Sequence, residues 1–236
     1  YGLYPEIISG RSAGACAGVF YADGYTPKEI LSFFKMMKFK EFAEFVLPKG
    51  GFFKTSGFQS FLKKHLKART FEELQLPLRV VATDIEHGKS HVFTKGELIP
   101  AVIASCSVPI VFTPMEIDGH YYVDGGLFKN FPVSVIRKEC TKIIGVNVSP
   151  ITAMEYKPSL KYMLERSFHY MSGSNTLLDR NLCDYLIEST GLLGYSMFDL
   201  EHVDEIYEMG YDLAKKYLEQ NRDKLANDFV CLQYVE

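Results

Sequence analysis

A serine near the start of the chain stands in a pattern that could supply a nucleophile. Residues 10–14 read Gly-Arg-Ser-Ala-Gly, a Gly-x-Ser-x-Gly motif centred on Ser12. The apolar run at 6–9 predicts a buried strand before the motif, and the small and apolar residues from 12 to 22 predict a helix after it. A serine on such a strand-to-helix turn is pushed to an exposed apex, where it can attack a carbonyl group.

The neighbours of Ser12 could support the same chemistry. We expect Gly10 and Gly14 to avoid Cβ clashes in the tight turn. Backbone N–H groups at a helix start favour negative charge, so the N–H of Ala13 could donate to the oxyanion of a tetrahedral intermediate. The motif is short, and an ordinary glycine-rich turn that binds phosphate is the alternative interpretation.

Asp124 is the candidate general base, because a serine hydroxyl is a weak nucleophile until a base accepts its proton. It ends a predicted hairpin strand and is followed by Gly125 and Gly126, which leave backbone freedom and space above the carboxylate. A simple Asp-Gly turn is the alternative. A Ser–Asp–His triad would need a later histidine, which His169 or His202 could supply, although both fall in predicted helices.

The elements that must position these residues alternate between strands and helices. Residues 26–29, Thr-Pro-Lys-Glu, predict a capped helix start, and Asp118-Gly119 predicts a type I′ turn between two short strands. The remaining predictions are strands at 77–83, 115–117, 120–123, 142–148 and 229–235, and helices at 60–67, 100–105 and 203–218. This order predicts a layered α/β fold around a mainly parallel sheet, with residues 1–236 forming one domain.

Seven phenylalanines crowd one region and are interleaved with lysines. They are Phe33, Phe34, Phe39, Phe42, Phe45, Phe52 and Phe53. A helix packed on the sheet with a solvated lysine face is the interpretation that we favour. A lid or acyl-chain platform that touches a membrane is the alternative.

The composition excludes several classes of protein. The 236 residues carry a formal charge of -3, so the basic excess of a nucleic-acid binder is absent. No run of about 18 apolar residues predicts a membrane span. The five cysteines are widely spaced without a CxxC pair, which favours free thiols in a reducing compartment over disulfides or a zinc site. We therefore expect a cytoplasmic protein.

Two motifs together resemble the patatin-like phospholipase family of the compact bacterial sort. They are Gly-Arg-Ser-Ala-Gly-Ala at 10–15 and Asp-Gly-Gly at 124–126, and the stretches 82–84, 101–109 and 130–133 look similar as well. The resemblance implies a three-layer α/β/α fold and hydrolysis of lipid acyl esters through an acyl-serine intermediate. It carries over Ser12 as nucleophile and Asp124 as base, without histidine, metal or organic cofactor. The partners that it implies are a lipid or acyl-ester substrate and peripheral contact with a membrane.

Two features depart from that family. Its members usually carry a glycine-rich loop before the nucleophile whose N–H groups form the oxyanion hole, whereas only Gly2 precedes Gly10 here. We expect the first strand and this loop to be missing, although losing even one donor costs roughly 3–4 kcal/mol of transition-state stabilisation. Arg11 is larger than is usual, and we expect its side chain to point into solvent, with binding of a phosphate headgroup as the alternative. A catalytically inactive lipid-binding module is therefore a further hypothesis.

Overall fold

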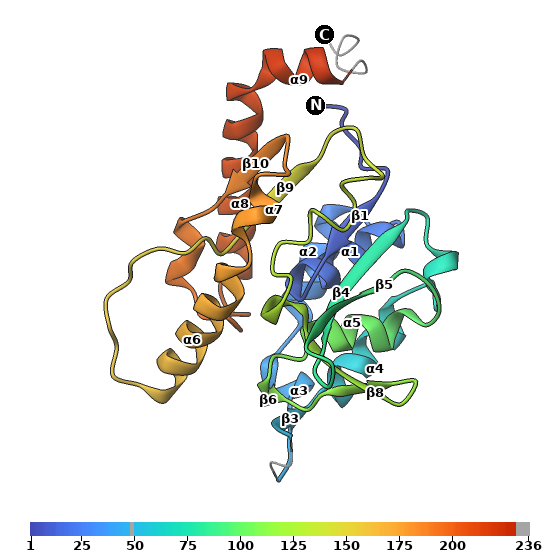
Figure 1. Ribbon diagram of the computed structural model, residues 1–236, viewed down its shortest axis with the longest axis vertical. Helices are drawn as coiled ribbons and strands as arrows, with labels where there is room; N and C mark the ends of the chain where they lie inside the picture. The colour runs from blue at the N-terminus through green and yellow to red at the C-terminus, as the bar shows by residue number, and fades with distance from the viewer. Residues whose placement is uncertain (48–49, 230–236) are drawn as a thin grey trace.

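The computed structural model describes residues 1–47 and 50–229, so all but the first residue of the strand predicted at 229–235 lies outside the described residues. Within these parts of the chain, helices pack around three β-sheets (Figure 1). The helices are α1 (Ala13–Ala22), α2 (Pro27–Met36), α3 (Phe39–Phe42), α4 (Ser56–His65), α5 (Leu98–Cys106), α6 (Leu160–Ser174), α7 (Leu177–Arg180), α8 (Val203–Gln220) and α9 (Arg222–Asp228). Short 3-10 turns lie at Phe71–Glu73, Gly125–Leu127 and Gly191–Gly194.

The largest sheet is built on the buried strand β4 (Leu78–Asp84). Strand β1 (Ile8–Gly10) pairs with it in parallel, while β5 (Lys89–Phe93) and β8 (His120–Asp124) pair with it antiparallel. Strand β7 (Met115–Ile117) extends the sheet by pairing with β8.

Two smaller sheets lie beside it. Strands β9 (Ile144–Asn147) and β10 (Tyr185–Glu188) form a parallel pair. Strand β3 (Gly51–Lys54) pairs antiparallel with β2 (Glu44–Phe45) and parallel with β6 (Ile110–Phe112). The layered α/β class is thus confirmed, and the largest sheet is mixed, with the predicted hairpin β7–β8 as one of its antiparallel pairs. Residues 85–88 join β4 to β5, and a two-residue turn joins β7 to β8. Because parallel neighbours need a much longer crossover, connections this short can link only antiparallel strands.

Local signals in the sequence set several of these elements. The Thr26 hydroxyl accepts the backbone N–H of Glu29, and the Glu29 carboxylate accepts that of Thr26, which is the expected capping box at the start of α2. Asp118 and Gly119 have φ values of 52° and 77°, as a type I′ turn requires.

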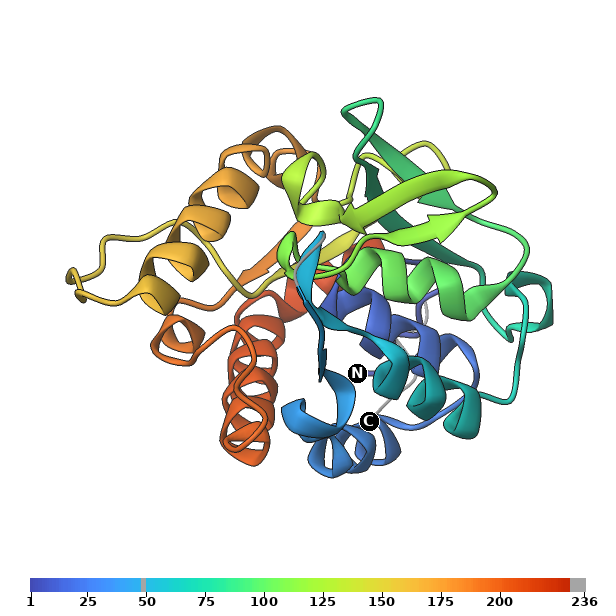
Figure 2. The same ribbon diagram turned by 90° about the horizontal axis from the view of Figure 1, so that it is seen from below.

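The main core lies between the large sheet and the helices α1, α4 and α5, which Figure 2 shows together on one side of that sheet. Fully buried side chains from three elements meet there, among them Val19 and Phe20 of α1, Val80 of β4 and Val102 of α5. Helix α8 stands beside strand β10 of the small sheet, and α6 packs against the turn at Gly125–Leu127 (Figure 1). None of the helices in the described residues combines the length and apolar character needed to cross a membrane.

Candidate active site

The ends of β1 and β8 meet on one edge of β4. Strand β5 pairs with residues 80–84 and occupies the other edge, while Gly10 lies opposite Val80 and Asp124 lies opposite Ala82. Because β1 runs parallel and β8 antiparallel to β4, the two strands approach each other head-on. Their last residues are two positions apart along β4, a distance of about 7 Å. The fold therefore brings the Ser12 motif and the Asp124 motif together from distant parts of the sequence.

Ser12 sits on a strained turn between β1 and α1. Its backbone has φ 48° and ψ −125°, a conformation that costs a non-glycine residue about 1–3 kcal/mol and requires support from its surroundings. Its N–H donates to the hydroxyl of the fully buried Ser105 at 2.8 Å, and that hydroxyl donates to the carbonyl of Val81 at 2.7 Å. A Cβ on Gly10 would lie 2.6 Å from the carbonyl carbon of Gly14, so the turn closes only with glycine at position 10.

The start of α1 leaves one N–H group next to Ser12 available. The N–H groups of Gly14 and Ala15 both donate to the carbonyl of Arg11, at 2.9 and 3.2 Å. Within the described residues, the N–H of Ala13 has no acceptor, and Ala13 is exposed. The steric need expected for Gly14 is absent, because a Cβ built there meets no atom within 4 Å.

Asp124 is fully buried, and its two carboxylate oxygens differ in their surroundings. Oδ1 accepts the N–H of Gly126 at 2.8 Å and lies 3.3 Å from the Arg11 guanidinium. Oδ2 has no hydrogen-bond partner in the described part of the chain. A buried oxygen without a donor costs about 1–3 kcal/mol, and a role as proton acceptor in catalysis is one reason for a protein to keep such a group.

The prediction that Arg11 points into solvent is wrong. Its side chain is 17% exposed and turns inward, where it pairs with Asp124. Its Nε donates to the carbonyl of Asn130 at 3.2 Å, and Nη2 donates to the side-chain oxygen of the same residue. A buried carboxylate needs a compensating charge, and Arg11 supplies it across the gap between the two motifs.

The two glycines after Asp124 permit close packing. A Cβ on Gly125 would lie 2.4 Å from the carbonyl oxygen of Val81, and one on Gly126 would lie 3.1 Å from Oδ1 of Asp124. Both glycines are buried, so the turn lies directly against β4. Larger side chains at 125 or 126 would displace the carboxylate.

Asn175 and Ser105 also hold the site, and neither was predicted from the sequence. The Asn175 side chain donates to the carbonyls of Gly126 and Leu127, at 2.9 and 3.1 Å, and accepts the N–H of Asn130 at 2.7 Å. It thus anchors the turn after Asp124 to the end of α6. The only local signal at Asn175 is a helix stop, and Ser105 lies in an apolar helix where it reads as a small core residue.

The histidines considered for a triad have other partners. Nδ1 of His169 faces Arg166 at 2.8 Å and Nε2 faces the carbonyl of Ser149 at 3.1 Å, while burial lowers the pKa of the ring. His202 pairs with Asp199 at 2.9 Å, and this hydrogen bond raises the His202 pKa. Neither ring is hydrogen-bonded to Ser12 or Asp124 in the described residues.

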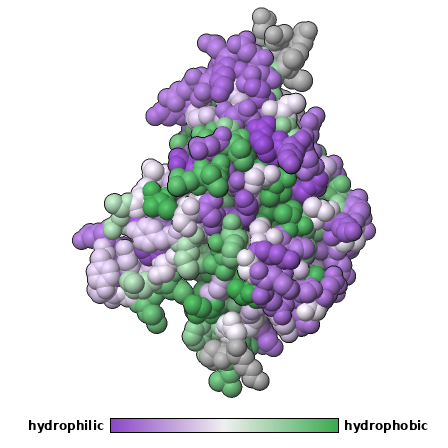
Figure 3. Space-filling view, viewed as in Figure 1, coloured by the Kyte–Doolittle hydropathy of each residue, from purple (hydrophilic) through white to green (hydrophobic). Residues whose placement is uncertain are grey.

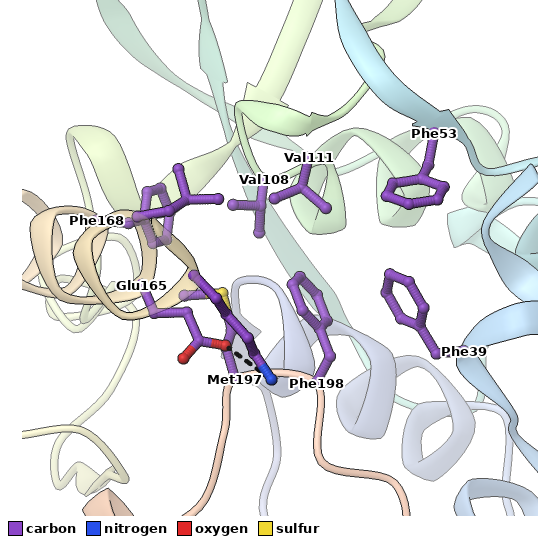
Figure 4. Close-up of a pocket in the computed structure, with 10 residues that line it drawn as sticks. Phe39, Phe53, Val108, Val111, Glu165, Phe168, Met197 and Phe198 are labelled. Atoms are coloured by element: carbon purple, nitrogen blue, oxygen red, sulfur yellow. Dashed lines mark ion pairs between the residues drawn. The ribbon is translucent and has the colours of Figure 1, made fainter. Parts of the chain in front are cut away.

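An apolar pocket of about 410 Å³ lies between the β3–β6 pair, α3, helix α6 and residues 197–198. Figure 4 shows aromatic side chains facing each other across it, with Glu165 on one wall. Its lining is Phe39, Phe53, Val108, Val111, Lys161, Leu164, Glu165, Phe168, Met197 and Phe198. Val108 follows Ser107, whose carbonyl accepts the backbone N–H of Asp124 at 2.8 Å, so one wall of the pocket is joined to the Asp124 backbone through a single residue.

The phenylalanine-rich region therefore divides into three parts. Phe33 and Phe34 pack on the main core, as the favoured interpretation expects. Phe39 and Phe53 line the pocket instead. A third group is exposed at the β2–β3 end of the molecule, with Phe45 and Phe52 as its members. The side chain of Phe42 lies outside the described part of the structure.

Comparison with known proteins identifies the family. The sequence profile described as Patatin-like phospholipase matches residues 1–136, more than half of the chain and a stretch that contains both motifs. An uncharacterized protein of Acanthamoeba polyphaga mimivirus is 24% identical over 90% of this chain and 82% of its own length. Patatin-like phospholipase domain-containing protein 7 of Rattus norvegicus is 30% identical over 61% of this chain.

The match to the rat protein covers only 11% of its length. A probable lipid hydrolase of Invertebrate iridescent virus 6 is 26% identical over 55% of this chain and 52% of its own length. The chain therefore spans about a tenth of the rat relative and about half of the viral hydrolase. With the profile match over 1–136, these similarities show that the chain belongs to the patatin-like phospholipase family.

Proposed function

We propose that this protein hydrolyses acyl esters of lipids, with Ser12 as nucleophile and Asp124 as general base. The observation that carries this proposal is the buried Oδ2 of Asp124, which accepts no hydrogen bond from any described residue, together with the strained Ser12 turn. An acceptor without a donor is what a general base needs before it takes the proton of a serine hydroxyl. Family membership and the viral lipid hydrolase support the same class of reaction.

The reaction proceeds in two halves. Oγ of Ser12 attacks the ester carbonyl carbon while its proton passes to Oδ2 of Asp124, and the intermediate collapses as that proton passes to the departing alcohol. This leaves an acyl group on Ser12. A water molecule then attacks the acyl carbon, Asp124 accepts its proton, and the fatty acid leaves as the proton returns to Oγ. No step requires a histidine, metal or organic cofactor.

The backbone of the turn supplies stabilisation for the oxyanion. Of the N–H groups at positions 12 to 15, only that of Ala13 lacks an acceptor in the described residues. It lies at the positive end of α1, where negative charge is favoured. The hydrogen bond from Ser12 to Ser105 keeps this N–H in place by fixing the turn.

A dyad accounts for the geometry better than a triad does. His169 uses both ring nitrogens, because Arg166 donates to Nδ1 and Nε2 donates to the carbonyl of Ser149. Accepting the proton of Ser12 would require breaking one of these contacts. His202 stands on the surface beside Asp199.

The apolar pocket is the proposed site for the acyl chain. Its walls are almost entirely aliphatic or aromatic, and its volume of about 410 Å³ falls in the usual range of small-ligand sites. Leu164→Trp should fill part of this space and lower kcat/KM for a long-chain p-nitrophenyl ester while sparing a short-chain one. Losing room for two methylenes should cost about 1.6 kcal/mol, or more than tenfold. Equal loss for both esters would place the acyl chain elsewhere.

The end of the molecule formed by β2 and β3, beside the pocket, is the proposed membrane contact. Leu47 is 84% and Phe45 67% exposed, and Phe52 and Ile110 are exposed beside them. Figure 3 shows hydrophobic surface at the lower end of the molecule, where Figure 1 labels β3. Phe53, the neighbour of Phe52, lines the pocket, so a lipid held at this surface would lie next to the acyl site.

Vesicle binding tests this contact. The double substitution Phe45→Ser with Phe52→Ser should weaken sedimentation with anionic phospholipid vesicles. Each substitution removes an apolar side chain that would be buried in the membrane interface. Leu177→Ser with Leu178→Ser is the matched control, since those leucines are exposed apolar residues of α7, away from the β2–β3 end (Figure 1). Equal binding by both double variants would refute the membrane contact at β2–β3.

Labelling by a fluorophosphonate probe tests the dyad itself. Ser12→Ala should abolish labelling, and Asp124→Asn should lower its rate strongly because the amide cannot accept the proton. Asp118→Asn is the matched control, since Asn also tolerates the positive φ of that turn. Hydrolysis of a phospholipid should change in parallel.

Other outcomes have definite meanings. Wild-type protein that does not label, yet binds vesicles, would refute catalysis and favour a lipid-binding module. Labelling that persists in Asp124→Asn but disappears in His169→Gln or His202→Gln would replace the dyad with a triad.

A further inference from the structure

A second cluster of reactive side chains lies at the opposite end of β8 from Asp124. It contains Asp84, the last residue of β4, His87 in the turn after it, and His120, the first residue of β8. Register brings them together, because Asp84 pairs with Tyr122 across the β4–β8 ladder. One potential ligand atom from each of the three side chains lies within 4.8 Å of the other two.

The Asp84–His87 half of the cluster is held in place by the fold. The Asp84 side chain is only 5% exposed, and its Oδ1 accepts the backbone N–H of His87 at 3.0 Å. Nδ1 of His87 lies 2.9 Å from Oδ2. When each ligand atom lies about 2.0–2.1 Å from a tetrahedral zinc ion, two ligand atoms lie roughly 3.4 Å from each other. A zinc ion could therefore replace the proton shared by Asp84 and His87 if the two side chains moved apart by about half an ångström.

The second histidine comes from a different element and brings a further carboxylate. The rings of His87 and His120 have centroids 5.5 Å apart. Nδ1 of His120 lies 3.7 Å from Oε2 of Glu86, and that oxygen also accepts the N–H of Tyr121 at 3.1 Å. Both imidazoles are about half exposed, so an ion can reach them from solvent.

The donor set defines the class of ion. Two imidazoles with one or two carboxylates suit Zn²⁺ and its neighbours among the transition metals, whereas Mg²⁺ and Ca²⁺ prefer oxygen ligands alone. We propose that Asp84, His87 and His120 form a binding site for Zn²⁺, with Glu86 as the nearest further ligand. This site is separate from the dyad and does not depend on the proposed function.

The proposed ion would tie two parts of the sheet together. Asp84 ends β4 and His87 lies in the β4–β5 connection, while His120 opens the strand that ends at Asp124. A metal bound to all three residues would clamp the β7–β8 hairpin to β4 beyond the last ladder pair, Asp84 with Tyr122. Zinc should therefore raise the thermal unfolding temperature of the whole chain.

The chain contains its own matched control. Asp199 and His202 repeat the Asp-x-x-His arrangement, with Nδ1 2.9 Å from the carboxylate and the backbone N–H of His202 bonded to it at 3.1 Å. The ring next to His202 is Tyr195 rather than a second histidine. If two imidazoles define the site, His202→Ala should leave zinc binding unchanged.

Calorimetric titration of metal-stripped protein with ZnCl2 tests the proposal, with Co²⁺ absorption as a second probe of coordination. We expect one zinc per chain that His120→Ala or His87→Ala weakens roughly tenfold or more, with no such change in His202→Ala and no comparable binding of CaCl2. Both ligands are surface residues, and circular dichroism verifies that each variant is folded. Zinc that fails to bind wild type, or binds all variants with the same affinity, would overturn the site.

Discussion

The buried hydroxyl of Ser105 joins the Ser12 turn to the central strand, and removing it should destabilise both. In Ser105→Ala, the N–H of Ser12 loses its acceptor and the carbonyl of Val81 loses a donor. Each backbone group left without a partner costs about 1–3 kcal/mol, so the loss of two partners should lower the free energy of unfolding by about 2–6 kcal/mol. The strained φ of Ser12 also loses its main support.

Ser172→Ala is the matched control for this experiment. Ser172 is 2% exposed, and its hydroxyl donates at 2.7 Å to the carbonyl of Phe168, four residues earlier within α6. The helix ladder already uses that carbonyl, so deleting the hydroxyl should cost less than about 1 kcal/mol. The two variants remove the same atom from equally buried sites and differ in whether backbone groups are left without partners.

Urea denaturation and labelling kinetics measure the two consequences. We expect Ser105→Ala to unfold at clearly lower urea concentration than Ser172→Ala, with an unchanged slope. In folded protein, a displaced Ser12 should label roughly ten to a hundred times more slowly with a fluorophosphonate. If Ser105→Ala and Ser172→Ala have the same midpoint and the same labelling rate, Ser105 does not support the turn and the reasoning fails.

Three further perturbations follow from the same contacts. Gly10→Ala should destabilise the fold by about 1–3 kcal/mol in urea denaturation, because its Cβ meets Gly14 at 2.6 Å, whereas Gly14→Ala should gain up to about 1 kcal/mol. Asn175→Ala breaks three hydrogen bonds around the turn after Asp124 and should lower stability by about 1–3 kcal/mol and slow labelling. Burial lowers the pKa of His169 below 6.5, so the stability tied to its neutral ring is present above that pH and lost as the pH falls below it. His169→Gln should therefore flatten the acid side of a stability–pH curve.

Each of these has an outcome that contradicts it. Equal midpoints for Gly10→Ala and Gly14→Ala would show that the turn tolerates a Cβ at either glycine. If Asn175→Ala is as stable as wild type and labels at the wild-type rate, the turn after Asp124 keeps its conformation without Asn175. An acid limb in His169→Gln as steep as in wild type would assign the acid sensitivity to other groups.

Local signals in the sequence predicted the features that a few neighbouring residues determine. The Asp118-Gly119 turn needs only two residues that accept positive φ, and the capping box needs only Thr26 and Glu29, so both were found from the sequence and are present. The strand-to-helix context of Ser12 was predictable for the same reason.

The parts that failed depend on contacts between distant residues. Arg11 was expected in solvent because its neighbours in sequence offer no partner, while Asp124 and Asn130 lie more than a hundred positions away. Asn175 carries no sign in the sequence that it anchors the turn after Asp124. The hairpin signal predicted the antiparallel pair β7–β8, whereas the choice of β1, β5 and β8 as partners of β4 is not encoded in apolar periodicity.

The meeting of β1 and β8 on one edge of β4 has a mechanical consequence. Thermal motion that shifts or tilts β4 moves the last residues of β1 and β8 with it. The distance between the nucleophile and the base therefore varies less than the position of either group. The pocket wall contributed by Phe53 and Val111 belongs to a different sheet. That wall can widen or narrow around acyl chains of different shape while the reacting groups keep their spacing, which separates adaptation to the substrate from the geometry of bond cleavage.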